Sequence, residues 1–319
     1  MKAAVRTRYV HPAQLTVQEV EKPVPGDHEV LVKVGTTTVN RSDFHVLTGK
    51  PLTMRLFTGL SRPRQIITGS DFAGTVEAAG QEVKLFKTGD RVMGFGGVFG
   101  CGSHAQYLVF PEHKGIISLP DNLAFDQAVV CAEGAFYALC SVRSVKPASG
   151  QQALVIGATG AIGSSTVQLL KYYGVRVTAV CGSEHRDLVS SLGAARIIDY
   201  KKENFLLDSE KYNMIFDAIG KNSFWKCKTL LRKKGVFTSS GGIENLLYAL
   251  ATPLAGGKKV IFSPLANIKD GLGFIMNLVV KGSFRPVIDR SYPLERIAEA
   301  FDYVATGEKI GNVILAMDS

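Results

Sequence analysis

The chain has 319 residues, of which 46% are hydrophobic and 20% are charged. These values describe an ordinary soluble globular protein that is long enough for two domains with sizeable cores. The formal net charge is +9. The basic residues are scattered as short pairs such as Lys201-Lys202 and Lys233-Lys234, so the charge alone gives only weak support for nucleic-acid binding.

The five cysteines are widely spaced, and none forms a Cys-x-x-Cys pair. This spacing indicates neither a disulfide framework nor a structural zinc lobe. The N-terminus runs directly into β-like sequence without a signal-peptide core, and no uninterrupted apolar run approaches the length of a membrane span. We therefore expect reduced cysteines, a cytoplasmic location and no membrane partner.

The first part of the chain predicts antiparallel β structure. Short runs rich in β-branched residues alternate with turn signals such as Pro25-Gly26 and Thr88–Asp90. The expected strands are Leu15–Val20, Glu29–Thr37, Gly74–Ala79 and Tyr107–Phe110. Near Asp121 the pattern changes to helical periods, and Phe125–Leu139 is expected to form one helix.

From Gln151 onward, strands and helices alternate, which predicts a doubly wound parallel sheet. The expected strands are Ala153–Ile156, Val175–Val180, Arg196–Ile198, Met214–Asp217, Gly235–Ser239 and Lys259–Phe262. The tail departs from this alternation, with helices expected near Lys269–Lys281 and Pro293–Thr306 and strands at Pro286–Ile288 and Asn312–Ala316. We expect this tail to pack back on the first domain.

A glycine-rich turn follows the strand at Ala153–Ile156 and opens a helix over Ile162–Tyr173, on which Ile162, Thr166, Leu169, Leu170 and Tyr173 share one face. The turn reads Ala158-x-Gly160-x-x-Gly163, so alanine stands where a dinucleotide-binding fingerprint usually has its first glycine. Glycines let a backbone approach phosphates, and the helix N-terminus favours negative charge. We therefore expect a pyrophosphate to bind at Gly157, Ala158, Thr159, Gly160, Ala161, Ile162 and Gly163.

The end of the next strand indicates which nicotinamide cofactor binds. Cys181 stands where an NAD enzyme would place an acid, and a hydroxyl residue and Arg186 follow, a combination that accommodates a 2′-phosphate. Two alternatives remain: Glu184 as a displaced ribose acceptor, and Arg186 as an ordinary solvated helix residue. The sequence favours NADPH.

Several motifs together carry a family resemblance over nearly the full length. They are Val39–Asp43, Gly69–Val76, Phe86–Val92, Gly157–Gly163, Ser191–Ala194, Ile198–Tyr200, Gly282–Asp289 and Tyr292–Leu294. With them the chain resembles the zinc-independent quinone oxidoreductase branch of the medium-chain dehydrogenase/reductases. The resemblance implies an α/β fold in which residues 1–120 and 266–319 form a GroES-like substrate domain and residues 121–265 form a Rossmann domain.

The resemblance also implies roles for single residues. Ser183, Arg186 and Tyr200 would surround the 2′-phosphate of NADPH, and Gly241 completes the expected cofactor site. The positions of the three zinc ligands of related alcohol dehydrogenases look like Asn40, Ser70 and Cys131. Because one thiolate cannot form a three-ligand site, no metal is expected.

Without zinc, the easier acceptors are a quinone or an α,β-unsaturated carbonyl, because conjugation spreads the developing charge. We expect Asn40 to lie nearest the substrate, as a hydrogen-bond donor or an orienting group. The alternative is that Asn40 and Asp43 only brace a turn. Related enoyl thioester reductases carry a tyrosine acid near the position of Pro51, and His45 is a weak candidate to replace it.

Three further hypotheses remain open. The segment Lys50–Arg64 holds four basic and no acidic residues, and it either recognises an anionic substrate such as an acyl-CoA or is a solvated loop. The protein could instead be an NADPH-binding regulatory or nucleic-acid-binding protein with little catalysis. By analogy, we expect a homodimer formed through the strand at Lys258–Ser263.

Overall fold

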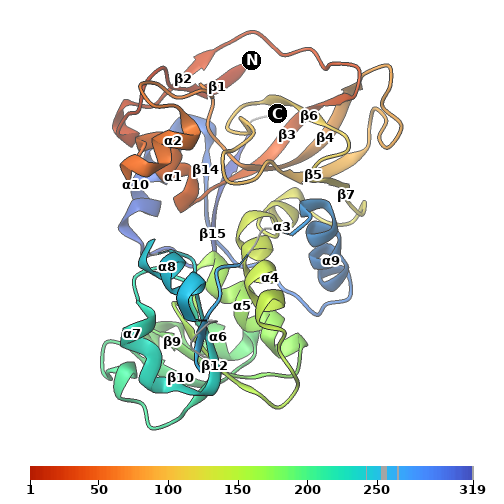
Figure 1. The fold of residues 1–319 in the computed structure, drawn as a ribbon. Coiled ribbons are helices and arrows are strands. Elements are labelled where there is room, and N and C mark those ends of the chain that lie inside the picture. Colours follow the sequence, from red (N-terminus) through yellow and green to blue (C-terminus); the bar gives the residue numbers. More distant parts are fainter. Residues whose placement is uncertain (242, 253–256, 264–265, 318–319) are drawn as a thin grey trace. The chain divides into compact units, whose positions relative to one another are not determined.

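The computed structural model describes residues 1–241, 243–252, 257–263 and 266–317. Its contacts divide the chain into two compact units (Figure 1). Unit 1 comprises Met1–Glu133, Asn267–Met276 and Pro286–Ser319, and unit 2 comprises Gly134–Ala266 and Asn277–Arg285. The first boundary thus falls at Glu133, whereas residue 120 was expected from the sequence.

Unit 1 is built mainly of β structure. Its largest sheet has seven strands, six of them in the order β14-β15-β3-β4-β5-β7, with β6 pairing on β3; β1 and β2 form a separate two-stranded sheet. The strands are β1 (Lys2–Val5), β2 (Thr16–Glu19), β3 (Glu29–Val39), β4 (Asp71–Ala79), β5 (Arg91–Phe95), β6 (Tyr107–Pro111), β7 (Ile116–Ser118), β14 (Ile288–Pro293) and β15 (Asn312–Ala316). Its helices include α1 (Arg41–Thr48), α2 (Arg55–Thr58), α3 (Phe125–Val129) and α10 (Ile297–Thr306).

The central strand β3 shows why this sequence forms a sheet. Val30, Val32 and Val34 alternate along it and are almost fully buried, which is the period of two expected for a strand with one face on a core. They pack with Phe72 and other apolar side chains in one core cluster. The strand therefore positions the residues that follow its end at Val39.

The two ends of the chain meet in unit 1. Strand β15 pairs antiparallel with β3, with Val313 opposite Val39, and parallel with β14. Figure 1 draws β15 in blue and β3 in orange-red, colours near opposite ends of the sequence scale. A second core cluster joins Leu47 of α1 to Phe301 of α10. The expectation that the tail returns to the first domain is confirmed.

Unit 2 contains a six-stranded sheet in which all strands are parallel, in the order β10-β9-β8-β11-β12-β13. The strands are β8 (Gln152–Ile156), β9 (Arg176–Cys181), β10 (Ala194–Asp199), β11 (Tyr212–Asp217), β12 (Leu231–Ser239) and β13 (Lys259–Val260). The helices are α4 (Glu133–Val145), α5 (Ala161–Tyr172), α6 (Arg186–Leu192), α7 (Phe224–Cys227), α8 (Ile243–Ala251) and α9 (Ile268–Val280), of which α4 and α9 extend across a unit boundary. The expected doubly wound α/β fold is confirmed.

Helix α5 is more deeply buried than a one-faced amphipathic pattern predicts. Thr166, Leu169 and Leu170 are buried as expected, but the polar side chains of Ser164 and Gln168 are buried too. The side-chain amide of Gln168 donates to the backbone oxygen of Arg285 (3.0 Å) and accepts from its backbone N–H (2.7 Å). These bonds explain why a polar residue can lie inside the fold.

The single helix expected over Phe125–Leu139 is two helices, α3 and α4. Between them the backbone N–H groups of Cys131 and Ala132 bond to oxygens only three residues earlier. Phe125–Val145 meets the length and mean-hydropathy criteria for a membrane-spanning helix, although Asp126, Glu133 and Arg143 interrupt its apolar sequence. The apolar window is 72% buried, and a core helix meets the same criteria, so this is weak evidence for a span.

Candidate functional site

The three glycines of the turn between β8 and α5 have different structural roles. Gly157 has a positive φ of 78°, which L side chains rarely adopt. A Cβ atom on Gly163 would lie 2.0 Å from the backbone oxygen of Gly157, so this position tolerates only glycine. A Cβ on Gly160 would meet nothing within 4 Å. Two glycines therefore shape the turn, and the third leaves open space above it.

The N-terminus of α5 begins in this open space. Gly160 is the N-cap residue and supplies no side-chain cap, and Ala161, Ile162 and Gly163 form the first turn of the helix. Their backbone N–H groups have no partner within the helix, and the helix dipole adds positive potential there. This arrangement fits the pyrophosphate expected at the turn.

The residues expected to select NADPH lie together at the ends of β9 and β10. Ser183 lies in a 3-10 turn directly after β9, and Arg186 begins α6. The backbone N–H of Tyr200 donates to the backbone oxygen of Cys181 (3.3 Å), which holds the exposed Tyr200 beside that turn. The structure thus brings together Cys181, Ser183, Arg186 and Tyr200.

Two acidic side chains lie in the same region. Glu184 forms an ion pair with Lys201, so the residue suggested as a ribose acceptor already has a cationic partner. Asp199, the last residue of β10, belongs to the motif Ile198–Tyr200 but was given no role in cofactor binding. Its pKa is lowered by hydrogen bonds from the backbone of Lys201 and from Ser183. Arg186 has no ion pair among the described residues.

A second group of polar residues lies at the carboxyl ends of β11 and β12 in the unit 2 sheet. The carboxylate of Asp217, at the end of β11, accepts from the backbone N–H of Asn222 (2.8 Å) and from the Ser239 hydroxyl (3.1 Å). The N–H of Gly241 donates to the same hydroxyl (3.3 Å). These residues follow β11 and β12, and the strand order reverses between β8 and β11. A crevice at such a reversal is the usual ligand site of this architecture.

In unit 1, Asn40 belongs to a buried polar network. It is the N-cap residue of α1, and its backbone N–H donates to Asp43 (2.9 Å). Its side-chain Nδ2 donates to Oγ1 of Thr38 (2.6 Å) and Oε2 of Glu133 (2.9 Å). Both amide hydrogens are therefore directed at protein acceptors. This geometry supports the bracing and orienting roles and leaves no free N–H for the expected donor role.

Glu133 links this network and was missed by the sequence analysis. Its carboxylate also accepts from the hydroxyls of Ser70 (2.6 Å) and Ser42. The only signal in the sequence was one acidic residue inside the apolar run Ala128–Leu139. The first turn of α4 places this side chain beside Asn40 and Ser70.

Three buried carboxyl groups share this region: Asp43, Asp71 and Glu133. Burial raises the pKa of all three, and the charge of Glu133 contributes at Asp43 and Asp71. The pKa of Asp71 rises to about 7. The cluster therefore retains a proton near neutral pH, since like charges in a low-dielectric site do not all ionise.

Two basic residues adjoin the cluster. Burial lowers the pKa of His104 to about 4, so its imidazole is neutral; Nε2 lies 2.9 Å from the backbone oxygen of Thr38 and Nδ1 lies 2.7 Å from Oγ1 of Thr68. Burial also lowers the pKa of Lys309 to about 8, although the charge of Glu133 opposes this shift. Lys309 is thus a cation close to Glu133.

The side chains at the positions compared with zinc ligands do not fit that metal. Asn40 and Ser70 both donate hydrogen bonds to Glu133, and the Cys131 thiol donates to the backbone oxygen of Gln127 (3.2 Å). Burial raises the pKa of Cys131 to about 12. Zinc needs deprotonated donors turned toward one point. Among the described residues, no group of three or more His, Cys, Asp or Glu side chains could hold a metal ion.

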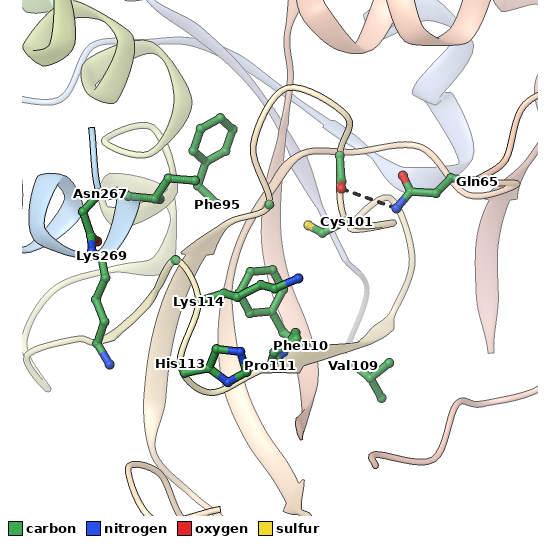
Figure 2. Close-up of a pocket in the computed structure, with 14 residues that line it drawn as sticks. Gln65, Phe95, Cys101, Val109, Phe110, Pro111, His113, Lys114, Asn267 and Lys269 are labelled. Carbon is green, nitrogen blue, oxygen red and sulfur yellow. Dashed lines mark hydrogen bonds between the residues drawn. The ribbon is translucent and has the colours of Figure 1, made fainter. Parts of the chain in front are cut away.

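A pocket of about 460 Å³ lies within unit 1 (Figure 2). Its lining combines apolar side chains, including Phe95 and Phe110, with the polar groups of His113, Lys114 and Lys269. Its wall adjoins the buried network: the backbone N–H of Gly96 and the thiol of Cys101 both donate to the backbone oxygen of Ser70 (2.7 and 3.5 Å). Its size falls in the range of small-molecule sites.

The remaining candidates have structural partners. Nδ1 of His45 lies 2.8 Å from the backbone oxygen of Lys50, and burial lowers its pKa. In the segment Lys50–Arg64, the guanidinium of Arg55 stacks over the Tyr9 ring, 4.5 Å from its centroid. This cation is held by the protein, whereas Arg62 and Arg64 are exposed.

Comparisons with known proteins cover almost the whole chain. Residues 26–121 match the alcohol dehydrogenase GroES-like domain, and residues 192–315 match a family described as zinc-binding dehydrogenase. The chloroplastic quinone-oxidoreductase QR1 of Triphysaria versicolor is 32% identical over 308 residues, which cover 93% of this chain and 92% of that protein. A chloroplastic NADPH-dependent alkenal/one oxidoreductase of Arabidopsis thaliana is 31% identical over 299 residues, which cover 91% of this chain and 72% of that protein.

The fold agrees with these matches. The solved structure of a quinone oxidoreductase from Coxiella burnetii superposes with a TM-score of 0.90 at 23% identity and covers 100% of this chain and 99% of that one. Fold, domain matches and sequence identity over nine-tenths of the length lead to one assignment. The chain is an oxidoreductase that belongs to the medium-chain dehydrogenase/reductase superfamily, in its quinone oxidoreductase-like branch.

Proposed function

We propose that the chain transfers a hydride from NADPH to a quinone or to the activated C=C bond of an α,β-unsaturated carbonyl. The observation that carries the proposal is the uncapped N-terminus of α5 above the open space at Gly160. In bound NADPH, the reduced nicotinamide is the hydride source. The similarity to a quinone oxidoreductase and an alkenal/one oxidoreductase supports both acceptor classes.

The preference for NADPH over NADH rests on the group at the ends of β9 and β10. Arg186 offers a planar guanidinium suited to a phosphate, and Ser183 and Tyr200 offer hydroxyl groups. Because Glu184 is paired with Lys201, it presents less negative charge to a 2′-phosphate. The acidic Asp199 is the opposing feature, and Ser183 and the Lys201 backbone stabilise its charge from within the protein.

The proposal includes no zinc, because Asn40 and Ser70 are hydrogen-bond donors to Glu133. A conjugated acceptor needs less electrophilic help than a simple ketone, since its developing charge is delocalised. We propose the pocket bordered by Phe95, Cys101 and Phe110 as the acceptor site. In this proposal Asn40 acts through Ser70, Glu133 and the pocket wall as a positioning residue.

The decisive experiment measures oxidation of NADPH and NADH with a panel of quinones, enones and enoyl thioesters. We expect turnover with NADPH on quinones or enones. Arg186→Gln should reduce kcat/KM for NADPH roughly tenfold, the effect of one charge-assisted contact, and leave NADH unchanged. Lys233→Gln, an exposed charge change on β12, is the control. NADPH binding without turnover on any acceptor would favour a regulatory or nucleic-acid-binding protein instead.

We also propose that the protein is a homodimer that pairs through the edge of the unit 2 sheet. Strand β13 ends the strand order and pairs only with β12 among the described residues. An edge strand presents unpaired backbone groups to a second copy. Sedimentation equilibrium tests this proposal, and a monomer at micromolar concentration would refute it.

A further inference from the structure

Large apolar side chains are concentrated on one exposed segment of unit 1. Six of them are between 48% and 70% exposed. We call them the apolar strip: Leu52, Leu56, Phe57, Leu60, Ile66 and Phe99. Five of the six fall within 15 residues of sequence. Scattered exposed apolar residues are normal, but such a concentration marks an interaction surface.

The strip is held in place, and two of its rings are in contact. The rings of Phe57 and Phe99 stack with centroids 5.7 Å apart and an interplanar angle of 23°. Behind them, the Tyr9 hydroxyl bonds to Oγ1 of Thr58 (2.7 Å), and the N–H of Arg64 bonds to the backbone oxygen of Thr58. The backbone is therefore fixed from the inside while the leucine side chains face outward.

The charges around the strip have one sign. Lys50, Arg62 and Arg64 are exposed, and residues 50–66 contain no acidic residue. None of these three cations has an ion pair among the described residues. Apolar side chains beside unpaired cations complement a surface with anionic headgroups above hydrocarbon.

We propose that the apolar strip, with Lys50, Arg62 and Arg64, docks the protein on an anionic lipid surface. A second copy of this chain fits less well, because a two-fold contact would bring the same cations together. A nucleic acid would meet the cations, but four of the six strip residues are aliphatic and offer no ring for stacking on bases. The expectation of no membrane partner rested on the absence of a spanning run, and a docking surface needs none.

The strip lies beside the proposed acceptor pocket. Gln65, which precedes Ile66, and Gly100 and Cys101, which follow Phe99, line that pocket. Figure 2 shows the hydrogen bond from the Gln65 side chain to the backbone oxygen of Gly100 (3.4 Å) that joins these two segments. An acceptor dissolved in the lipid would thus reach the pocket over a short path. The docking itself does not depend on the proposed reaction.

Co-sedimentation of the full chain with vesicles tests the docking. We expect binding to phosphatidylcholine vesicles that contain roughly one quarter phosphatidylglycerol, and at least tenfold weaker binding to phosphatidylcholine alone. Arg62→Gln with Arg64→Gln should weaken binding to the anionic vesicles roughly 30-fold, since each cation contributes about fivefold. The matched control is Lys33→Gln with Lys87→Gln, two exposed cations elsewhere in unit 1.

A second pair of variants tests the apolar contribution. Leu56→Ser with Leu60→Ser should weaken binding roughly tenfold or more, whereas Leu85→Ser with Leu207→Ser, which changes two leucines exposed elsewhere, should not. The chain has one tryptophan, Trp225. In a Trp225→Phe background, Phe57→Trp should therefore give a fluorescence blue shift on vesicle binding. Circular dichroism of each variant confirms its fold.

Four results would overturn the proposal. The first is no binding of the wild-type chain to the anionic vesicles. The second and third are an equal loss of binding in the double variant and its control, either for the cation substitutions or for the leucine substitutions. The fourth is no blue shift from the tryptophan at position 57. Binding of a 20-nucleotide single-stranded DNA (a length of roughly two protein sites) that requires Arg62 and Arg64 but not Leu56 and Leu60 would assign the surface to nucleic acid.

Discussion

Glu133 shows how one side chain organises a buried site. Its carboxylate accepts hydrogen bonds from Asn40, Ser42 and Ser70, which come from two separated parts of the sequence. The buried Ser70 hydroxyl would be unsatisfied without it, at a cost of about 1–3 kcal/mol. The same charge opposes ionisation of Asp71, so Glu133 influences both the geometry and the protonation of the network.

The raised pKa of Asp71 predicts an unusual pH dependence of stability. A carboxyl whose pKa rises from 3.8 to about 7 on folding stabilises the fold most at low pH. That contribution is lost as the pH rises from about 4 to about 7. Asp71→Asn, which stays neutral, should become more stable relative to wild type by about 2 kcal/mol between pH 5 and pH 8.

Urea unfolding of both proteins at the two pH values measures this difference. The comparison with the variant cancels the opposite contribution of His104, whose lowered pKa adds stability as the pH rises from about 4 to 6.5. Asp302→Asn, at an exposed position of α10, is the control. A difference that does not change with pH would show that Asp71 ionises normally in the folded protein.

Asn40→Ala should separate positioning from cofactor binding. The change removes the two donors directed at Thr38 and Glu133, so we expect a loss of about 1–3 kcal/mol in the free energy of unfolding. Turnover should fall, by roughly tenfold or more, because the pocket wall loses its support. The KM for NADPH should stay within about twofold, since α5 is unaffected. Steady-state kinetics with a quinone or enone tests this, and unchanged turnover would remove Asn40 from the site.

At the scale of elements, two glycine substitutions in the turn before α5 should have separable effects, one on NADPH binding and the other on stability. Gly160→Ala adds a methyl group to open space, whereas Gly163→Ala adds one 2.0 Å from a backbone oxygen. We therefore expect Gly160→Ala to keep the wild-type Tm and to weaken NADPH binding roughly tenfold or more. Gly163→Ala should lose about 1–3 kcal/mol of stability or more.

Thermal unfolding and NADPH titration followed by fluorescence measure the two effects. Gly273→Ala is the control, because Gly273 lies in α9 and a Cβ there meets nothing within 4 Å. That variant should gain up to about 1 kcal/mol from helix propensity and bind NADPH normally. Normal NADPH affinity of Gly160→Ala would contradict the assignment of the turn as the phosphate site.

At the scale of the whole molecule, the chain forms two units with separate cores. The cluster around Leu154, Ile215 and Phe237 lies in unit 2, and the cluster around Val32 and Phe72 lies in unit 1. The glycine turn belongs wholly to unit 2. NADPH at 100 times its Kd should raise the free energy of unfolding of that unit by about 2.7 kcal/mol.

Hydrogen exchange in the presence and absence of NADPH measures this gain by region. We expect NADPH to slow hydrogen exchange in the strands of unit 2, measured at β8 and β11. Smaller changes are expected in β3 and β4 of unit 1. Equal protection throughout the chain would mean that the two units unfold as one cooperative block, contrary to their separate cores.

The sequence was most informative where interactions are local. The strand at Asn312–Ala316 was predicted with its exact limits, and the turn at Gly157–Gly163 was placed correctly, because hydrophobic period and turn chemistry act between near neighbours. It was least informative at Val130–Ala132, where continuous helical periodicity hides the break between α3 and α4. It also missed β5 and β7, which are short and whose pairing depends on strands distant in sequence.

The fold class, the return of the C-terminal strand and the site expected to bind a dinucleotide could therefore be read from the residues alone. The contacts of Glu133 with Asn40 and Ser70, the pairing of Lys201 with Glu184, and the exposure of the apolar strip beside a pocket became known only from the folded chain. The difference lies in the range of the interactions. Secondary structure and turns follow from neighbours a few residues apart, whereas buried charge and exposed apolar surface depend on which distant segments the fold brings together.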